Sequence, residues 1–385
     1  MSGAQAAGSD RPEKATLRIG FMPLADCAPL VMASVLGFDA RYGLCLLLEK
    51  QHSWSAMRDR LRSGELDAAH ALTGLLYGLQ MGVGSVPQDM ALLMNLNQNG
   101  QAIVLSRALA AAGVTDGASL AELMRTEPRR YTFAHTFPTG NHAMWLCYWL
   151  AAAGIDPVRD VSLVTVPPAQ MAANLDAGHM DGFCAGEPWS RRAVVEASGA
   201  LAGHSSEVWP DHPGKALGTR ADFAARHPNT CRALVACLLE TARWLDASPA
   251  NREAAAEVLA SPAWIHTRVD LLRDCLLPRR ARSPGLRFFG EGEATFPWLS
   301  DGMWFLTQQR RWGLLRAEPD YLAVARAVNR VDLYREAAAL AGVDVPSGPM
   351  RSSRLIDGKL WDGSDPAGYA ASFAIHQRYP QAGEA

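Results

Sequence analysis

The amino-acid sequence predicts an α/β protein of two lobes, each a mainly parallel sheet covered by helices, with a ligand cleft between the lobes. The first observation is length, because 385 residues exceed what one small core needs and suit two lobes of ordinary domain size. The second is a β-α-β-α-β pattern that occurs twice along the chain. Each copy implies a parallel sheet with helices on its faces.

The first copy of the pattern begins near the amino terminus. Apolar, β-branched strand segments alternate with segments of helical periodicity, and glycines stand where the helices should end. In order, the predicted elements are a strand Leu17–Leu24, a helix ending near Gly37, a strand Leu44–Gln51, a helix Ser53–Ser63 stopped by Gly64, and a short strand beginning at Asp67.

The second copy repeats this order with a similar junction. The segment LRSGELD, ending at Asp67, matches LDAGHMD, ending at Asp181, and each joins a helix-ending glycine to a buried strand. The predicted elements are a strand Tyr131–Pro138, a helix His142–Gly154, a strand Val161–Pro168, a helix Ala169–Ala177 stopped by Gly178, and a strand from Asp181. Ligands of such sheets bind beyond the carboxyl ends of the strands, so two facing sheets can line one cleft.

The two copies divide the chain into regions. We predict a disordered amino-terminal tail over residues 1–15, a discontinuous lobe I over residues 16–105 and 216–385, and a lobe II over residues 106–215. Strand-like segments at Ala102–Ser106 and Ala216–Arg220 are candidates for the crossings between the lobes. From Ala221 onward the pattern is helical and is expected to pack on lobe I, with Arg279–Gly292 as a loop or flap.

Composition and cysteine usage limit the environment and the partners. The chain is 49% hydrophobic and 20% charged with a net charge of -2, which predicts neither direct nucleic-acid binding nor attachment to an anionic membrane. The amino-terminal segment has no apolar core typical of an export signal, and no segment is long and apolar enough to span a bilayer. Seven cysteines without CxxC spacing indicate reduced thiols. We therefore expect a cytoplasmic protein.

Enzyme and metal signatures are missing from the sequence. It has no GxSxG elbow, HExxH motif, Walker loop or GxGxxG after a strand. None of its ten histidines stands at a spacing to cysteine or carboxylate that is typical of metal ligands. We expect a binding protein without catalytic residues, metal or cofactor.

The polar groups at the loop ends of the strands are the candidate site. Gly140, Asn141 and His142 join a strand to a helix amino terminus, where unpaired backbone N–H groups and the helix dipole favour an anion. The alternative for Asn141 is an ordinary helix cap, with His142 as a first-turn residue. Lys215 follows a proline turn before a strand, and the alternative is an exposed lysine.

Two further candidates have equally ordinary alternatives. Trp54 opens the second helix of lobe I, although a tryptophan there is more often a core residue. Gln101 begins the first crossing segment, where a turn residue is the alternative. The residues alone leave these choices open.

The chain resembles the nitrate/bicarbonate-binding branch of the type II solute-binding proteins over nearly its whole length. The matching segments are HSWSAMRDRLRSGELDAAHAL, NQNGQAIVLS, FAHTFPTGNHAMWLCYWLAAAGIDP, VTVPPAQMAANLDAGHMDGFCAGEPW, HPGKALGTRADF, MWFLTQQRRWG and VNRVDLYREAAALAG. The runs TFPTGNH, DGFCAGEPW and HPGKALG are specific in combination.

The resemblance implies a set of anion-binding residues. The anion would be held by the residues at Trp54, Gln101, His142 and Lys215, with Pro168 and the stretch Ala185 to Glu187 lining the site beside Gly140 and Asn141. In the bicarbonate branch glutamine and glutamate typically replace the residues at 142 and 215, and calcium is recruited. His142 and Lys215 can both be cationic, which favours nitrate or nitrite bound without a metal.

The resemblance also suggests a role in gene regulation. Most family members are exported and deliver their ligand to a transporter, whereas a cytoplasmic member resembles the NasS-type sensors. Such a sensor holds an RNA-binding antiterminator of the NasT (ANTAR) class inactive until nitrate or nitrite closes it. The alternatives are a component of an ABC transporter, a different ligand such as bicarbonate, a sulfonate or a pyrimidine, and an enzyme of the thiamine-pyrimidine-synthesis type.

Overall fold

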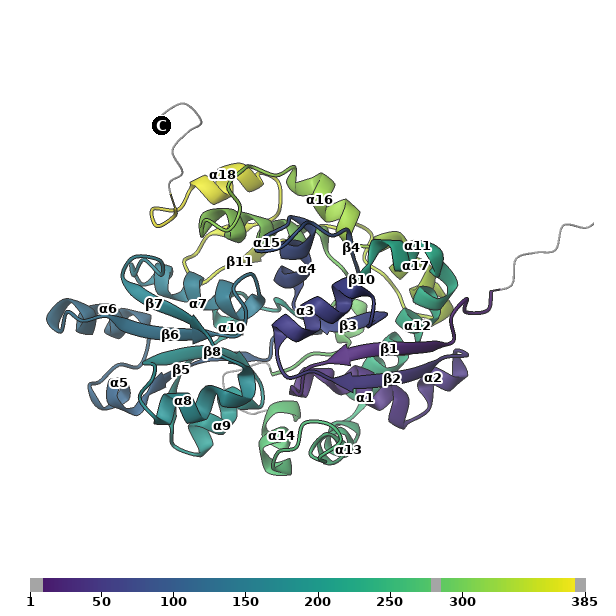
Figure 1. The fold of residues 1–385 in the computed structure, drawn as a ribbon, viewed down its shortest axis with the longest axis horizontal. Helices are drawn as coiled ribbons and strands as arrows, with labels where there is room; N and C mark the ends of the chain where they lie inside the picture. The colour runs from purple at the N-terminus through teal and green to yellow at the C-terminus, as the bar shows by residue number, and fades with distance from the viewer. Residues whose placement is uncertain (1–9, 278–284, 378–385) are drawn as a thin grey trace, which may run out of the picture.

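The computed structural model describes residues 10–277 and 285–377, and within them two five-stranded sheets mark two lobes (Figure 1). The lobe I sheet has the order β2-β1-β3-β10-β4 and the lobe II sheet the order β7-β6-β8-β5-β9. The strands of lobe I are β1 (Thr16–Phe21), β2 (Cys45–Lys50), β3 (Ala68–Ala71), β4 (Met90–Gln98) and β10 (Pro213–Arg220). Those of lobe II are β5 (Gln101–Ser106), β6 (Tyr131–His135), β7 (Val161–Thr165), β8 (Gly182–Gly186) and β9 (Gly199–His204).

Both sheets are mixed, with the same arrangement in each lobe. The predicted parallel strands pair as expected, since β1 is parallel to β2 and β3, and β6 is parallel to β7 and β8. β10 and β5 are each antiparallel to both of their neighbours. The two-lobed α/β fold is therefore confirmed, and each sheet adds antiparallel strands to a parallel core.

The predicted crossing segment at Ala102–Ser106 forms most of strand β5, which pairs with β8 and β9 inside the lobe II sheet. The chain passes from β4 to β5 one step earlier, through Asn99 and Gly100, both with positive φ (62° and 89°). A Cβ on Gly100 would lie 2.2 Å from the Leu286 side chain, so this turn has no room for a larger residue.

Short helices cover both sheets and connect their strands. In lobe I they are α1 (Ala28–Val35), α2 (Phe38–Arg41), α3 (Trp54–Ser63) and α4 (Thr73–Gln80), preceded by a 3-10 turn η1 (Ala25–Cys27). In lobe II they are α5 (Arg107–Ala111), α6 (Gly117–Thr126), α7 (Asn141–Ala152), η2 (Pro168–Gln170), α8 (Met171–Asp176), α9 (Trp189–Val195) and α10 (Ser205–Val208).

Helix α3 shows how local sequence sets the element boundaries. The Ser53 side chain accepts a hydrogen bond from the Ala56 N–H at 3.1 Å and caps the helix start. Gly64 ends the helix in the left-handed conformation (φ 80°), as the sequence predicts. The predicted helix Ala169–Ala177 is instead a 3-10 turn followed by α8.

The chain beyond β10 is helical and contacts both lobes, whereas the sequence predicted packing on lobe I. Its helices are α11 (Ala221–Arg226), α12 (Pro228–Ala247), α13 (Pro249–Leu259), α14 (Val269–Leu276), α15 (Leu299–Arg311), α16 (Tyr321–Val328), α17 (Val331–Leu340) and α18 (Pro366–Ala371), with η3 (Gly290–Gly292) and a hairpin of β11 (Ser353–Arg354) and β12 (Leu360–Trp361). α15 packs on α4 and on α7, and α14 packs on α9 (Figure 1). Aromatic side chains are the reason, because Trp304 of α15 lies 5.1 Å from Trp145 of α7 between ring centroids.

Part of the predicted amino-terminal tail is fixed on lobe I. Lys14 forms an ion pair with Asp67 at 2.7 Å, and Glu13 accepts a hydrogen bond from the Thr230 N–H at 2.8 Å. Residues 1–9 of the predicted tail and residues 279–284 of the predicted flap lie outside the described residues. Across the described ranges, no helix has both the length and the apolar character needed to cross a membrane.

Candidate functional site

A buried ion pair lies where the carboxyl end of β1 meets strand β10. The Lys215 ammonium of β10 is 2.7 Å from the carboxylate of Asp26 in η1, and both side chains are almost wholly buried (0% and 1% exposed). Burial alone would raise the pKa of Asp26, but Lys215 and His70 together hold the pKa of this carboxyl well below its usual range. Lys215 uses one of its N–H donors on Asp26, and an ammonium has three.

His70 of β3 completes this ion pair from the other side. Its Nδ1 accepts a hydrogen bond from the Met22 N–H at 3.3 Å, so the neutral ring carries its proton on Nε2. Nε2 faces the second carboxylate oxygen of Asp26 at 2.9 Å. Burial lowers the pKa of His70, which favours the neutral ring.

His142 approaches the same place from lobe II. It lies in the first turn of α7, is fully buried, and its Nδ1 is 2.6 Å from the Thr136 hydroxyl. Nε2 has no hydrogen-bond partner among the described residues, and a Cβ added to Gly186 would lie 3.5 Å from it. Burial, and then Lys215, lower the pKa of His142 well below its ordinary value.

Trp54 joins the two halves of this group. Its ring lies 6.1 Å from the His70 ring and 6.5 Å from the His142 ring between centroids, and the Lys215 ammonium lies 6.0 Å from the Trp54 ring. The indole N–H is buried and unpaired within the described part of the chain. The structure therefore brings Trp54, His142 and Lys215 together, as the site prediction requires.

This arrangement suits a small anion chemically. Buried polar atoms without a partner are rare in folded proteins and are expected where a ligand binds. Here the indole N–H of Trp54 and the Nε2 of His142 are both unpaired, next to an ammonium with unused donors. The α7 amino terminus adds the positive end of a twelve-residue helix.

Gln101 has its amide turned toward Trp145. Its Oε1 accepts from the Trp145 indole at 2.8 Å and its Nε2 donates to the Asn99 carbonyl at 3.1 Å. One amide N–H remains for a ligand. Gln101 follows the crossing turn directly. Its hydrogen bonds with the Trp145 indole and the Asn99 carbonyl hold its amide in place.

Gly140 and Asn141 connect the lobes. Asn141 is fully buried; its Oδ1 accepts from the Gly74 N–H at 3.3 Å and its Nδ2 donates to the carbonyls of Pro213 and Gly214. Gly140, not Asn141, is the residue before the first helical position, and a Cβ there would lie 2.5 Å from Leu72. The alternative of a helix cap therefore does not apply to Asn141, whose side chain joins lobe II to lobe I.

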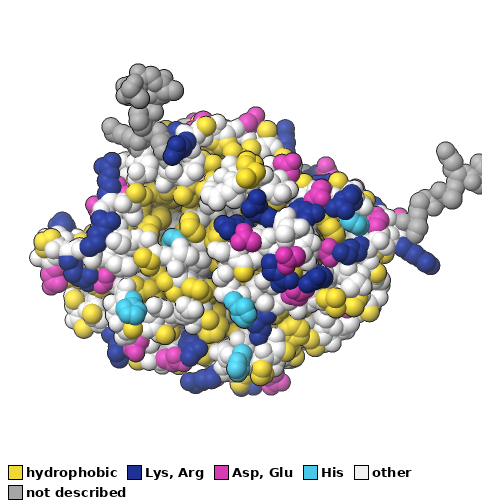
Figure 2. All heavy atoms as spheres, in the orientation of Figure 1, with side chains coloured by type: hydrophobic (Ala, Val, Ile, Leu, Met, Phe, Trp, Pro, Cys, Tyr) yellow, Lys and Arg dark blue, Asp and Glu magenta, His cyan; other side chains and the backbone are white. Residues whose placement is uncertain are grey.

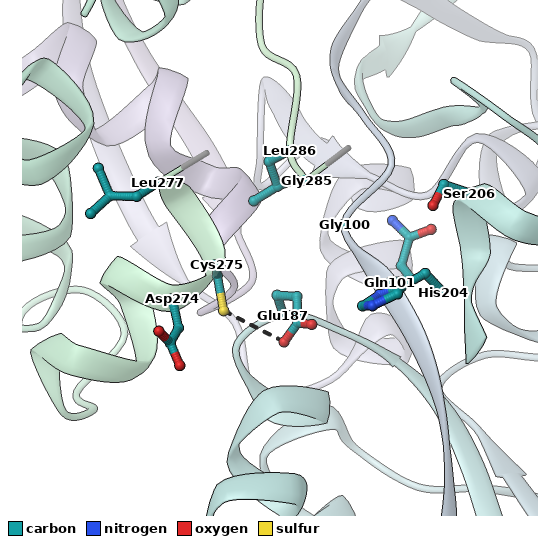
Figure 3. A pocket seen from close by; sticks show the side chains of 10 residues that line it. All are labelled: Gly100, Gln101, Glu187, His204, Ser206, Asp274, Cys275, Leu277, Gly285 and Leu286. Carbon is teal, nitrogen blue, oxygen red and sulfur yellow. Dashed lines mark hydrogen bonds between the residues drawn. The ribbon is translucent and has the colours of Figure 1, made fainter. Parts of the chain in front are cut away.

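Glu187 and Ala185, which were predicted to line the site, make their structural contacts mainly through the backbone. The Glu187 carbonyl accepts from the Ala25 N–H at 2.8 Å across the lobes, and Ala185 pairs with Ala102 in the sheet. The Glu187 carboxylate instead accepts from the Arg191 N–H and faces Cys275 (Figure 3). Pro168 is buried at the start of η2, beyond the carboxyl end of β7.

Gln101 and Glu187 also line a small neighbouring cavity that is partly open to solvent (Figure 3). Its other walls come from α14, from the β9–α10 junction and from the chain near Leu286. The cavity therefore borders the predicted site at the crossing turn. Across the residues described, no group of three or more histidine, cysteine or acidic side chains could hold a metal ion.

Sequence reasoning missed Asp26 and His70. Asp26 follows the first strand by a few residues, and His70 stands in the short strand DAAHAL. Both therefore lie near carboxyl ends of parallel strands, which is the position from which a site residue is expected. The contacts of Asp26 with Lys215 and His70 depend on β10 lying beside β3, and the sequence does not reveal this order.

The face of the molecule shown in Figure 2 has no large patch of side chains that all carry the same charge. Lys and Arg side chains alternate there with Asp and Glu side chains, notably over lobe I. Arg60, for example, lies within 3.0 Å of both Glu49 and Glu65. This face therefore does not indicate a charged ligand, and the candidate site remains the buried pair of Lys215 and Asp26.

Two mixed sheets with a buried polar group between them define a two-lobed solute-binding fold. A model of the NMT1-like family matches residues 10–260, so the chain belongs to this family. It is 38% identical over 398 residues to the nitrate/nitrite binding protein NrtA of Synechocystis sp., covering 96% of this chain and 87% of that protein. It is 36% identical over 379 residues to the bicarbonate transport ATP-binding protein CmpC of Synechocystis sp., covering 95% of this chain but only 56% of that longer relative.

The fold comparison agrees with the sequence comparison. The crystal structure of the periplasmic nitrate-binding protein NrtA from Synechocystis PCC 6803 matches with a TM-score of 0.90 and 36% identity. The match covers 95% of this chain and all of that chain. The predicted resemblance to the NrtA-like solute-binding proteins is thus confirmed.

Acid should destabilise the fold through its buried histidines. Burial lowers the pKa of four of them: His70, His135 (to about 4), His142 and His212 (to about 3). Below about pH 6.5 the unfolded chain takes up protons that the folded chain does not, so the free energy of unfolding falls as pH falls. Each histidine contributes up to about 1.4 kcal/mol per pH unit.

Urea unfolding at pH 7.5, 6.0 and 5.0 measures this slope. The His135→Gln variant is the control and should show a shallower slope than the parent chain. An unfolding free energy that stays constant between pH 7 and 5 would contradict the assignment of these rings as neutral.

Proposed function

We propose that this protein binds nitrate or nitrite between its lobes, beside Lys215, Trp54 and His142. The observation that supports the proposal is that the indole N–H of Trp54 and the Nε2 of His142 are buried without a partner among the described residues, next to a buried ammonium. A buried anion requires a nearby cation and hydrogen-bond donors, and the Lys215 ammonium has N–H donors beyond the one that binds Asp26. The likeness to relatives named as nitrate/nitrite-binding proteins supports the same ligand.

The size and hydration of the anion favour nitrate or nitrite over larger solutes. Both are planar and singly charged, and the cost of removing them from water is smaller than for phosphate or a carboxylate. Trp54 provides a flat wall, and Leu24 and His142 would both lie within 3.5 Å of a Cβ on Gly186, so the space is narrow. Lys215 and His142 supply donors where a calcium-dependent bicarbonate site would need oxygen ligands.

The expected affinity follows from the small size of the ligand. The best tiny ligands gain about 1.5 kcal/mol per heavy atom, so the four atoms of nitrate yield about 6 kcal/mol. This corresponds to a Kd of tens of micromolar. Tighter binding would require strong charge-assisted hydrogen bonds in a preformed site.

Replacing Lys215 tests the site directly. We expect Lys215→Met to reduce nitrate affinity by about 2–5 kcal/mol, because the counter-charge is lost. The change also leaves Asp26 buried without its partner, which costs about 3–5 kcal/mol of stability. The Asp26→Asn/Lys215→Met double variant removes both charges and should recover stability without recovering binding.

Isothermal titration with nitrate and urea unfolding, performed on both variants, separate the two effects. Nitrate affinity within threefold of the parent chain in the folded double variant would place the anion elsewhere.

The indole N–H of Trp54 offers a second test. Trp54→Phe keeps a flat aromatic wall but removes the unpaired donor, and a hydrogen bond to a charged group contributes about 1.5–3 kcal/mol. We expect about a tenfold to hundredfold rise in the Kd for nitrate. Trp244→Phe, in α12 and only partly buried, is the matched control and should bind as the parent does. Equal affinities of the two variants would argue against a ligand at Trp54.

We further propose that the protein acts in the cytoplasm as a nitrate/nitrite sensor. In this role the form without anion holds an RNA-binding antiterminator of the NasT class, and closure on the anion releases it. All seven cysteines are free thiols, which supports a reducing compartment. Linkage requires that the anion weaken the complex by the factor by which the antiterminator weakens anion binding.

Mixing the purified chain with such an antiterminator tests this role. We expect a complex in size-exclusion chromatography that about 1 mM nitrate dissolves, since this concentration exceeds the expected Kd many times. Chloride at equal ionic strength is the control. A complex that nitrate leaves intact would argue against the sensor.

Transport is the second candidate function, because relatives are named as parts of nitrate import and bicarbonate transport systems. Absence of any complex with the antiterminator, together with nitrate-dependent binding to a membrane transporter, would favour transport.

A further inference from the structure

The buried cluster at the centre of the site has no net charge to offer an anion. Lys215 contributes one positive charge and Asp26, 2.7 Å away, contributes one negative charge. His70 is neutral, because its Nδ1 accepts from the Met22 N–H and its Nε2 proton faces Asp26. A singly charged anion bound here would leave one negative charge uncompensated in a place that water does not reach, which is strongly unfavourable.

Nitrate cannot solve this imbalance by itself. Its conjugate acid is strong, so the ion stays unprotonated when bound, and a compensating charge must form on the protein. The titratable and charged groups that act on His142 are Lys215, Asp26, His135 and His212. Lys215 is already cationic and Asp26 already anionic, so a histidine is the remaining group that can gain a positive charge.

His142 is the histidine that lies beside Trp54 and has hydrogen bonds that allow this change. Its Nδ1 contacts the Thr136 hydroxyl at 2.6 Å, and a hydroxyl can donate to the neutral ring or accept from the protonated ring. Its Nε2 is unpaired beside Gly186, near Trp54. His212, in contrast, has both ring nitrogens engaged, by the Pro213 carbonyl and the Ser205 hydroxyl.

We propose that nitrate binds together with one proton from solvent, which His142 takes up. In the bound state, the His142 imidazolium and the Lys215 ammonium face the anion and the Asp26 carboxylate, so the charges balance. The proposal rests on the proposed anion site. Asp26 thereby becomes the residue that couples binding to pH, because its charge cancels that of Lys215 before the anion enters.

A coupled proton has a measurable consequence. If one proton is taken up per anion, the affinity for nitrate falls by about tenfold for each unit by which the pH rises, over the pH range in which a full proton is taken up. It also selects against doubly charged oxyanions, since sulfate would need a second proton or leave a buried charge. Nitrate affinity should therefore rise as pH falls, as long as the fold is intact.

Isothermal titration of the full chain with nitrate measures the proton directly. Titrations at pH 6.5, 7.5 and 8.5, each in two buffers of different ionisation enthalpy, yield the number of protons taken up per anion. We expect about one proton and a Kd that rises by about tenfold per pH unit. Sulfate in place of nitrate should show no binding at pH 7.5.

Two variants assign the proton. In Asp26→Asn the charge of Lys215 alone balances the anion, so proton uptake should fall toward zero and the Kd should become independent of pH. His142→Gln keeps an N–H donor but cannot titrate, and any remaining nitrate binding should likewise be independent of pH. His135→Gln is the control, because His135 is also a buried histidine near His142, and it should retain the uptake of about one proton.

The outcomes separate this inference from the anion site itself. Nitrate binding without proton uptake in the parent chain would overturn the inference and leave the site standing. Loss of uptake in His135→Gln with full uptake in His142→Gln would overturn the assignment to His142. An absence of nitrate binding at every pH would overturn the proposed site, and the coupled proton with it.

Discussion

The ion pair between Lys215 and Asp26 constrains the parts of the molecule that surround it. Two charges that are at most 1% exposed persist only while each remains paired, because an unpaired buried charge costs several kcal/mol. The pair joins the turn after β1 to the crossing strand β10, and His70 of β3 secures it from a third strand. Three segments distant in sequence are thus held in one geometry, and this preorganisation reduces what a ligand must order on binding.

The same turn forms hydrogen bonds between the two lobes. Ala25, next to Asp26, donates its N–H to the Glu187 carbonyl of lobe II, and Trp189 of lobe II donates to the Pro23 carbonyl. An anion beside Asp26 and Lys215 would therefore lie against residues whose neighbours join the lobes. Differential contact with the joined and separated forms is what a ligand needs in order to shift their populations.

Local sequence patterns predicted the positions of most helices and strands. They could not predict which strands pair or which distant side chains meet, because these depend on long-range contacts. Ser53 and Gly64 set the ends of α3, and the strand-to-helix junction at Gly140 was correctly placed because both signals lie within a few residues. The predicted crossing at Ala102–Ser106 became a sheet strand, because strand pairing depends on a partner at Gly182–Gly186. Asp26 and Lys215 lie 189 positions apart, so only the sheet order brings them together. Similarly, nothing local indicated that Trp145 would engage the Gln101 amide.

Lys215, His142 and Gln101 each form hydrogen bonds within the protein and each keep further hydrogen-bonding capacity. Lys215 bonds to Asp26, His142 to Thr136, and Gln101 to Trp145 and Asn99. A small anion would add hydrogen bonds without breaking any of these, so the protein needs little reorganisation to receive it. The Asp26 carboxylate would limit the charge of such a ligand, because a doubly charged anion beside it would leave more negative charge buried.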